Sequence, residues 1–356
     1  MRVGIVTDGL FPHAVGGIQR HTARLAPGLA ALGADVEVIA PDGHGVTAAG
    51  YDVLTLPWPE SRVYPLTLRR WAERCARAVA ERDYDVVIGQ GLNLWGLLPQ
   101  GAPPELFHPH GLEMSTVRDP VSRLKAWPLR WAARREARQA HAVVSLGGRL
   151  AGILEESLRV PRNRIVTIPN GVDTTEFVPG GSPDPATVLW VGRFFPNKAP
   201  DRMLEVFRRL KTPGARLVLV GDGPMKSALE ARADGNVTFA GAVSESSLHE
   251  LYRSATLVAV PSRDDGMPTV ILEAFACGCP AVAFDVGAVG ELVAAPTGVL
   301  IPAGDIDAMA RSIDELLSDP ARRAAAGAAA RAKAEEQFSW PAVAAQTLTV
   351  LESLRR

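Results

Sequence analysis

Cysteine is scarce in this chain, which has only Cys75, Cys277 and Cys279 among its 356 residues. An odd and sparse count excludes a disulfide framework and suits a reducing compartment. Cys277 and Cys279 flank a single glycine, but no second Cys/His pair stands at zinc-ligand spacing. We therefore interpret the two as small packed residues rather than as a metal clip.

Long apolar runs and a charge excess of one sign are also missing. No stretch approaches the roughly 20 apolar residues that span a bilayer, and Arg2 is followed by only four apolar residues, Val3 to Val6, before Thr7. This pattern predicts neither a membrane span nor a signal peptide. The net charge is −1, whereas dedicated nucleic-acid binders carry a strong basic excess. We expect a cytoplasmic protein, either free or peripheral at the inner face of the membrane, with no nucleic-acid partner.

The first predicted strand is not followed by the G-x-G-x-x-G fingerprint of dinucleotide-binding folds, which disfavours a dehydrogenase. Gly16 and Gly17 stand there instead. Two glycines let a backbone approach a ligand closely. Taken by itself, however, the pair is better explained by an ordinary turn.

What the chain does have is a regular alternation of short apolar strands with helices, typical of α/β folds with parallel sheets. A Pro/Gly-rich, helix-poor segment from Gly171 to Ala186 separates two such series. The length allows two cores. We predict an N-terminal Rossmann-like domain of residues 1–172 plus 339–356 and a C-terminal one of residues 173–338.

The most informative stretch follows a predicted strand that ends at Pro261. A polar loop from Ser262 to Gly266 leads into a helix that begins near Pro268, a residue that is tolerated in a first helical turn. The free amides of that turn, together with the helix dipole, form a site for an anion such as a phosphate.

Two carboxylates belong to this stretch. Glu273 lies four residues beyond Thr269, about 6 Å further along the same helix face. A carboxylate there can accept hydrogen bonds from a ribose diol whose diphosphate lies at the helix tip, and Asp265 would then face the sugar. The alternative is a solvated helix residue at Glu273 and a cap at Asp265, and this stretch alone does not separate the two interpretations.

Arg193 closes another apolar strand, and Lys198 precedes the next helix. Two cations at one strand end suit a diphosphate leaving group. The alternative is a pair of surface cations. Because positive charge near a helix start opposes the helix dipole, a bound anion explains the pair better.

His108 and His110 alternate on a further predicted strand, so both can face one side. A metal site would need more ligands than these two, and we expect none. We expect His110, at the strand end, to belong to the active site and His108 to be packed. Asp305 and Asp307 match a D-x-D pattern of metal-using enzymes, but they open a predicted helix, so N-capping explains them.

Together these motifs resemble those of glycosyltransferase family 4, a retaining family with the GT-B fold. The resemblance implies two Rossmann-like domains whose parallel sheets face each other across a cleft, with the last helix crossing back to the N-terminal domain. The matching pieces occur in family order over nearly the whole chain: Gly16-Gly17, His110-Gly111, Ile168 to Asp173, Val191 to Lys198, Val220 to Pro224, and the acidic loop and helix ending in Glu273.

The resemblance also implies a role for each matching position. Arg193 and Lys198 would bind the donor diphosphate, together with the amides around Gly266 to Thr269. Glu273 would bind the ribose, and His110 would approach the sugar near its reacting face. The expected catalytic residues are thus His110, Arg193, Lys198 and Asp265, and the expected donor-binding residues are Gly16, Gly17, Arg193, Lys198, Asp265, Gly266, Met267, Pro268, Thr269 and Glu273.

Two positions depart from the family pattern. Asp265 takes the place of the first Glu of the E-x7-E motif, which contacts the donor sugar, and is one methylene shorter. A shorter side chain reaches less far, so the contact of residue 265 with the donor sugar is uncertain and the donor preference is expected to shift. Ala199 replaces the glycine that often follows the lysine, a change that we expect to be harmless.

A basic segment carries two tryptophans. Between Arg118 and Arg138 there are seven basic and two acidic residues, with Trp127 and Trp131 interleaved. A basic, Trp-bearing helix can lie on anionic lipid. We favour the simpler interpretation, in which the helix packs its Trp face inward and solvates its arginines.

The function expected from the resemblance is transfer of a sugar from a UDP- or GDP-sugar to an acceptor hydroxyl with retained configuration, without metal or cofactor. The acceptor would be a sugar, a lipid-linked molecule or a small molecule. A sugar-nucleotide epimerase of the same fold would instead need acid/base carboxylates in the cleft. A non-catalytic nucleotide-sugar sensor is disfavoured because Arg193, Lys198 and Glu273 are all present.

Overall fold

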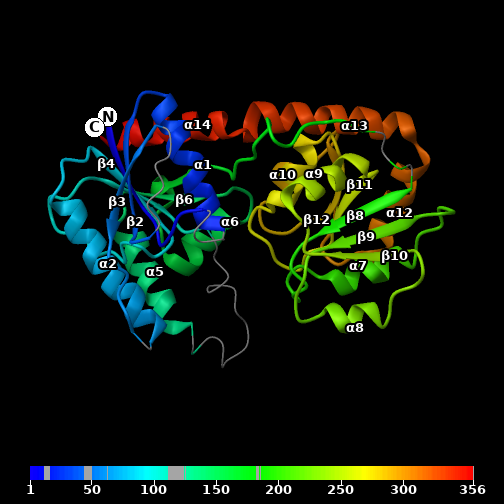
Figure 1. Cartoon of the computed structure of the whole chain (residues 1–356), viewed down its shortest axis with the longest axis horizontal. Helices are drawn as coiled ribbons and strands as arrows, with labels where there is room; N and C mark the ends of the chain where they lie inside the picture. Colours follow the sequence, from blue (N-terminus) through cyan, green and yellow to red (C-terminus); the bar gives the residue numbers. More distant parts are fainter. Residues whose placement is uncertain are drawn as a thin grey trace. The chain divides into compact units, whose positions relative to one another are not determined.

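The computed structural model describes residues 1–11, 17–43, 50–61, 63–110, 124, 126–181, 184 and 186–355. The chain forms two compact units (Figure 1), one of Met1–Pro169 with Trp340–Arg356 and one of Asn170–Ser339. The chain thus changes unit between residues 169 and 170 and between 339 and 340, where the sequence pattern placed the changes after residues 172 and 338.

The first unit is built on a parallel sheet of seven strands. Their order across the sheet is β3-β2-β1-β4-β5-β6-β7, and every neighbouring pair is parallel. The strands read as continuous apolar runs because helices cover both faces of such a sheet. They are β1 (Arg2–Val6), β2 (Asp35–Pro41), β3 (Asp52–Leu56), β4 (Val86–Gln90), β5 (Glu105–His108), β6 (Ala142–Ser145) and β7 (Ile165–Thr167).

Helices from both ends of the chain complete this unit. The last helix packs on the first so closely that a Cβ added at Gly28 would lie 2.9 Å from the Ala344 Cβ. The predicted return of the C-terminal helix to the N-terminal domain is therefore confirmed. The helices are α1 (Gly17–Ala31), α2 (Tyr64–Ala80), α5 (Trp127–Gln139), α6 (Leu150–Ile153) with the π-turn Leu154–Leu158, the 3-10 turn Arg162–Arg164, and α14 (Trp340–Leu354).

The second unit has a parallel sheet of six strands in the order β10-β9-β8-β11-β12-β13. Its strands are β8 (Thr187–Val191), β9 (Arg216–Val220), β10 (Val237–Gly241), β11 (Leu257–Val260), β12 (Ala281–Phe284) and β13 (Gly298–Ile301). Its helices are α7 (Pro200–Phe207), α8 (Lys226–Glu230), α9 (Glu245–Ser254), α10 (Thr269–Ala276), α11 (Val289–Leu292), α12 (Ile306–Ser318), α13 (Pro320–Lys333) and the π-turn Ala334–Phe338.

Both sheets follow the doubly wound order in which the strand sequence reverses at the first strand. The reversal lies between β1 and β4 in one unit and between β8 and β11 in the other. Ligands of such folds bind beyond the carboxyl ends of the strands at this switch point. The loops after β8 and β11 are therefore the place to look for a site in the second unit.

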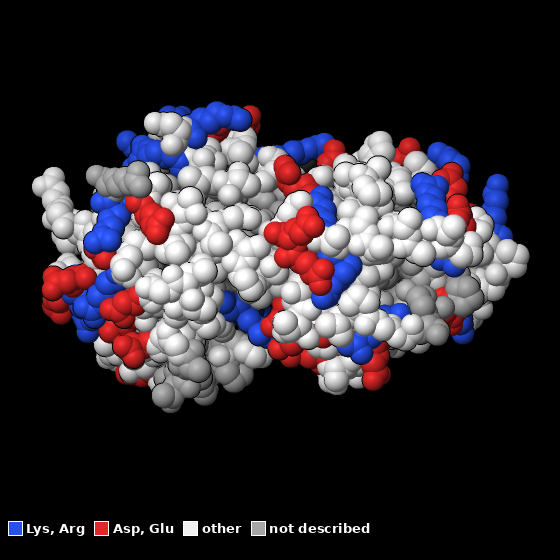
Figure 2. All heavy atoms as spheres, turned by 90° about the horizontal axis from the view of Figure 1, so that it is seen from above, with Lys and Arg blue, Asp and Glu red and all other residues white. Residues whose placement is uncertain are grey.

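The D-x-D pattern is explained by helix capping, as predicted. The Asp305 carboxylate accepts a hydrogen bond from the Ala308 amide at 2.9 Å, at the start of α12. Asp307 forms an ion pair with Arg209 at 2.8 Å. On the face drawn in Figure 2, acidic and basic side chains are interspersed with uncharged surface, which agrees with the low net charge.

One feature of the first unit's core was not predicted from the sequence. Glu105 on β5 and Glu136 on α5 are both buried, and the Oε1 atom of each has no hydrogen-bond partner among the described residues. Two neighbouring buried carboxyls cannot both ionise without a large cost, so we expect the pair to share one proton. Burial raises the pKa of both carboxyls, and the charge of Glu105 raises that of Glu136 further. Glu136 also accepts the Trp95 amide at 3.0 Å.

This acid pair predicts a loss of stability with rising pH. Because the folded state keeps a proton that the unfolded chain releases above the ordinary glutamate range, the free energy of unfolding should fall by up to about 1.4 kcal/mol per pH unit. Glu105→Gln supplies a permanent N–H donor, so it should flatten the profile and stabilise the protein at pH 8. Urea unfolding from pH 5 to 8.5 measures this effect, with exposed Glu60→Gln as the control. Parallel profiles for parent and Glu105→Gln would contradict the shared proton.

Candidate active site

The loops after β8 and β11 bring Lys198 and Asp265 into direct contact. The Lys198 ammonium donates to Asp265 Oδ2 at 2.6 Å, and the Ser262 hydroxyl donates to the same oxygen at 3.3 Å. The Asp265 side chain is 9% exposed and that of Lys198 26%. A cation and an anion thus lie paired at the switch point of this sheet. The sequence pattern indicated both residues but not their contact.

Arg193 follows the end of β8, and its exposed guanidinium lies over the Phe195 ring, 5.2 Å from the ring centre. The loop that carries it is fixed by backbone hydrogen bonds. The Phe194 amide donates to the Asp222 carbonyl and the Arg263 amide to the Asn197 carbonyl, each at 2.8 Å. The cationic loop is therefore held between the loops that follow β9 and β11.

A second ion pair, between Arg263 and Asp201, was not predicted from the sequence. Arg263 binds both Asp201 oxygens, at 2.8 and 2.6 Å, and the Pro196 carbonyl at 2.9 Å. The hydrogen-bonded guanidinium holds the pKa of Asp201 below its usual value. Bidentate pairs of this kind fix geometry as well as charge. This pair therefore sets the spacing between the loop with Lys198 and the loop with Asp265.

Glycines allow these loops to approach each other. Gly287, in the loop after β12, has φ +53°, and a Cβ there would lie 1.9 Å from the Asp265 carbonyl oxygen. The next amide, that of Ala288, donates to the Gly266 carbonyl at 2.8 Å. Gly221 is similar, because its Cβ would lie 2.0 Å from the Gly192 carbonyl oxygen. Only glycine fits such close backbone approaches.

Ala199 has φ +53° and ψ +49°, which is the left-handed region. This conformation costs an alanine roughly 1–2 kcal/mol more than a glycine. The expectation that this departure from the family pattern is harmless was therefore wrong for the backbone. The Lys198 loop carries a strain that a glycine would relieve.

The start of α10 is the place where the sequence predicts an anion site. Pro268 is extended there, with φ −70° and ψ 114°, and no side chain caps the helix. Met267 is buried, and its carbonyl accepts the Asn170 side-chain amide at 3.0 Å. Met267 can therefore serve a ligand only through its backbone, and Pro268 has no N–H to offer. The amides available for an anion are those of Gly266, Met267 and Thr269.

Glu273 lies one turn further along α10, as predicted. Its Oε2 accepts the Tyr252 hydroxyl at 2.7 Å. Tyr252 lies on α9 and is fully buried. Sequence reasoning missed this partner, because a tyrosine in an amphipathic helix shows no sign that its hydroxyl meets a carboxylate.

In the first unit, His110 lies at the end of β5 in a left-handed conformation, with φ +58°. Its ring stacks on that of His108, with 3.9 Å between ring centres, and its Nε2 contacts the Gln90 side-chain oxygen. His21 packs edge-on against both imidazoles. The structure thus places His108 in a packed position, as predicted, and adds His21 and Gln90. Gly17 begins α1, whereas Gly16 and Gly111 lie outside the described residues.

The three histidines have the proximity but not the tautomers of a metal site. One ring nitrogen of each lies within 4.8 Å of the others. However, His108 Nδ1 accepts the His110 backbone N–H at 3.2 Å, so the proton of the neutral ring is on Nε2 and blocks that atom as a ligand. Burial lowers the pKa of all three, that of His21 to about 4. The rings are therefore neutral near pH 7.

The structure corrects the interpretation of the basic segment, of which residue 124 and residues 126–138 are described. Trp127 is 64% exposed and Trp131 50%. The buried face of α5 instead consists of Ala132, Ala133, Glu136 and Ala137. Small alanines let the helix lie close to the sheet, so the two large indoles are left outside. The tryptophan face therefore points outward and not inward.

Two family models match the chain. The one described as Glycosyltransferase Family 4 matches residues 15–176, and the one described as Glycosyl transferases group 1 matches residues 172–333. Together the two matches cover the chain from residue 15 to residue 333 without a gap.

Similar proteins include a relative and two solved structures. A GDP-mannose-dependent monoacylated alpha-(1-6)-phosphatidylinositol monomannoside mannosyltransferase of Corynebacterium glutamicum is 27% identical over 99% of this chain and 98% of its own. Sucrose-phosphate synthase from Thermosynechococcus elongatus has a TM-score of 0.82, 22% identity and coverage of 99% and 98%. HepE from Anabaena, solved with UDP-glucose, has a TM-score of 0.75, 19% identity and coverage of 99% and 100%. At these identities the two structures bear on the fold alone.

Proposed function

Because the chain belongs to glycosyltransferase family 4, and is thus a transferase with the GT-B fold, we propose that it moves a sugar from a nucleotide-diphosphate sugar to an acceptor hydroxyl. UDP- and GDP-sugars are the proposed donors, because HepE was solved with UDP-glucose and the corynebacterial relative is named for GDP-mannose. The observation that carries the proposal is the convergence of Lys198, Arg193 and the uncapped start of α10 at one switch point.

The chemical step breaks the bond between the anomeric carbon and the diphosphate oxygen. Negative charge then grows on the diphosphate, and in this proposal Arg193, Lys198 and the α10 amides stabilise it. The acceptor oxygen bonds to the anomeric carbon on the same face, its proton passes to a phosphate oxygen, and the configuration is retained. No protein nucleophile is needed in this proposal.

The ion pair between Lys198 and Asp265 means that the donor diphosphate competes with a carboxylate for Lys198. Its ammonium is held by Asp265, so a diphosphate must share Lys198 with that carboxylate or draw it away. If it is drawn away, the Asp265 carboxylate becomes free to accept a sugar hydroxyl. Binding of the phosphates would thus prepare the sugar contact. His110, with its neutral ring, is proposed to offer a second contact to the sugar.

Donor hydrolysis tests the proposed function. Purified protein is incubated with UDP-, GDP- and ADP-sugars, and released nucleoside diphosphate is measured together with the anomeric configuration of the first sugar product by NMR. Release from one donor class with retained configuration is expected. Inverted product would refute retention, and binding without turnover over the whole panel, with acceptors added, would favour a sensor.

Metal removal should leave this activity intact. In the proposal Arg193, Lys198 and the helix amides balance the charge of the diphosphate, and the D-x-D aspartates are occupied as a cap and an ion pair. We therefore expect turnover in excess EDTA to stay within about twofold of turnover with magnesium. A full loss in chelator that manganese or magnesium restores would show a metal requirement.

We also propose a peripheral contact with anionic membranes. Leu124, Trp127 and Trp131 expose apolar surface beside the exposed Arg134 and Arg138. Exposed indoles next to arginines suit the interface of an anionic bilayer. None of the helices in the described residues has the length and apolarity to cross a membrane. The name of the relative from Corynebacterium glutamicum contains a monoacylated phosphatidylinositol monomannoside, and a lipid-linked acceptor would bring this chain to a membrane interface.

Vesicle binding measures the contact. Replacing both Trp127 and Trp131 by alanine should weaken binding to vesicles with anionic lipid by at least about tenfold, because two interfacial anchors are lost. Leu32→Ala, at another exposed apolar position of the same unit, serves as the control. Parent binding that is absent, or that is equal for the double variant, would refute the membrane surface.

A further inference from the structure

Glu273 is held from behind by a side chain that no motif indicated. Tyr252 reaches from α9 to α10 and donates its hydroxyl to Glu273 Oε2 at 2.7 Å. We propose that Tyr252 is a positioning residue that orients Glu273 toward the donor ribose and so sets the preference for ribonucleotides. This inference rests on the proposed function, in which Glu273 binds the ribose diol.

The tyrosine ring is fixed on several sides. It is fully buried and meets the Phe177 ring edge-on, with 6.1 Å between centres, and Phe177 packs in turn against His249 at 4.2 Å. Arg331 donates to the carbonyls of Phe177 and Ala276, which ties that segment to the end of α10. The hydroxyl therefore has a fixed position relative to α10, which a positioning residue requires.

In the hydrogen bond between Tyr252 and Glu273, the tyrosine hydroxyl is the donor and the carboxylate is the acceptor. Burial and the Glu273 charge hold the pKa of Tyr252 well above its usual range. The hydroxyl therefore stays protonated and donates to the carboxylate. A carboxylate has about four acceptor positions, and Tyr252 occupies one of them. A long, flexible side chain is thus fixed in one orientation before the ligand arrives, which removes an entropy cost of binding.

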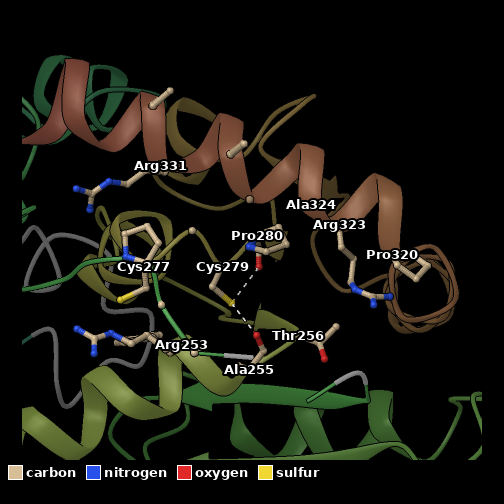
Figure 3. A pocket seen from close by; sticks show the side chains of 18 of the residues that line it. Arg253, Ala255, Thr256, Cys277, Cys279, Pro280, Pro320, Arg323, Ala324 and Arg331 are labelled. Atoms are coloured by element: carbon tan, nitrogen blue, oxygen red, sulfur yellow. Dashed lines mark hydrogen bonds between the residues drawn. The ribbon is translucent and has the colours of Figure 1, made fainter. Parts of the chain in front are cut away.

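The contact lies between the anion site and a cavity on its far side. Tyr252 lines a cavity of about 590 Å³. Arg253, Cys277, Cys279 and Arg331, which Figure 3 labels, line the same cavity. Tyr252 and Arg253 precede β11 in the chain and the two cysteines precede β12, so they lie near the amino ends of these strands, whereas the proposed anion site lies at the carboxyl ends. Without the hydroxyl of Tyr252, Glu273 would lose the bond that fixes its carboxylate on this side. Tyr252→Phe removes that bond and keeps the packed ring.

Ribose-dependent binding tests the role. Calorimetry gives the Kd of UDP and GDP, and of their 2′,3′-dideoxy forms, for the parent, Tyr252→Phe, Glu273→Gln and the double variant. We expect Tyr252→Phe to weaken the preferred ribonucleotide about fivefold to tenfold and to leave the dideoxy form unchanged. Glu273→Gln should weaken it more, and the double variant no further. With the donor sugar, KM should rise and kcat at saturation should change little.

Tyr84→Phe is the matched control, because Tyr84 also donates its hydroxyl to a glutamate, Glu37, in the other unit. It should leave every Kd unchanged. Equal loss for ribose and dideoxyribose in Tyr252→Phe, or no loss, would overturn the positioning role. If Glu273→Gln itself binds ribonucleotides like the parent, the assignment of Glu273 fails. If Glu273→Gln weakens ribonucleotide binding but Tyr252→Phe does not, the assignment of Glu273 to the ribose stands and only the positioning role of Tyr252 fails.

Discussion

Replacing Lys198 by alanine is expected to lower kcat by at least about 100-fold while the protein stays folded. The ammonium is one of two cations at the carboxyl end of β8, where the leaving diphosphate would develop its charge. A fixed cation in a protected site acts more strongly than one in bulk water, because no solvent must reorganise around it. The measurement is kcat at saturating donor, with circular dichroism to confirm the fold.

Lys198→Ala has a second effect that must be separated from the first. Asp265 is 9% exposed, and removing Lys198 leaves a nearly buried carboxylate without a counter-charge, which destabilises a protein. Arg193→Ala avoids this problem, because the Arg193 side chain is exposed and its described contact is with the Phe195 ring. We expect a loss of turnover of similar order. Exposed Lys211→Ala is the control for general charge effects. Turnover near the parental value in both site variants would refute the diphosphate assignment.

The fold could be predicted because its signals are local. Each buried parallel strand is a short apolar run and each covering helix has its own period, so their alternation in the sequence indicates the architecture. The positions of Arg193, Lys198, Asp265 and Glu273 were indicated for the same reason, since parallel sheets place their ligands at strand ends. The sequence supplied the strand ends, and the fold rule supplied the site.

What the sequence did not reveal depends on contacts between distant residues. Arg263 and Asp201 are 62 positions apart, and Tyr252 and Glu273 are 21 apart. Neither pair falls into a periodic pattern, so only the packed structure brings them together. The burial of Glu105 beside Glu136 could not be predicted either, because acidic residues are normally expected to face solvent.

The tryptophans of α5 show a different limit. An amphipathic pattern identifies two faces, but it does not say which face is buried when both contain apolar residues. Here Ala132, Ala133 and Ala137 fill the interface, and close packing of the helix on the sheet outweighs the burial of two larger indoles. Residue size decided the orientation, and hydrophobicity alone predicted it incorrectly.

Gly287→Ala is expected to be among the most damaging single-methyl substitutions in the second unit. The position has φ +53°, which costs a non-glycine residue roughly 1–2 kcal/mol, and the added Cβ would lie 1.9 Å from the Asp265 carbonyl oxygen and 2.6 Å from that of Gly266. A backbone atom cannot rotate away as a side chain can, so the whole loop that carries Asp265 must move. A displacement of about 1 Å in a positioning element can cost about 100-fold in rate.

Alanine substitutions at three glycines in this unit separate the backbone strain of a positive φ from the steric clash of the added Cβ. At Gly235 an added Cβ meets no atom within 4 Å and the backbone is ordinary, and at Gly214 there is again no contact but φ is +72°. Gly235→Ala should therefore be nearly neutral, and Gly214→Ala should lose only the strain energy.

Gly287→Ala should lose at least about 2 kcal/mol of unfolding free energy and most of its kcat/KM for the donor. Urea unfolding and donor kinetics on the three variants test this order. We expect the clash to move Asp265 away from Lys198. The donor turnover of Gly287→Ala should therefore fall far more than the difference in unfolding free energy between Gly287→Ala and Gly214→Ala would explain. If Gly287→Ala matches Gly214→Ala in stability and keeps its turnover, the loop after β12 does not position the site.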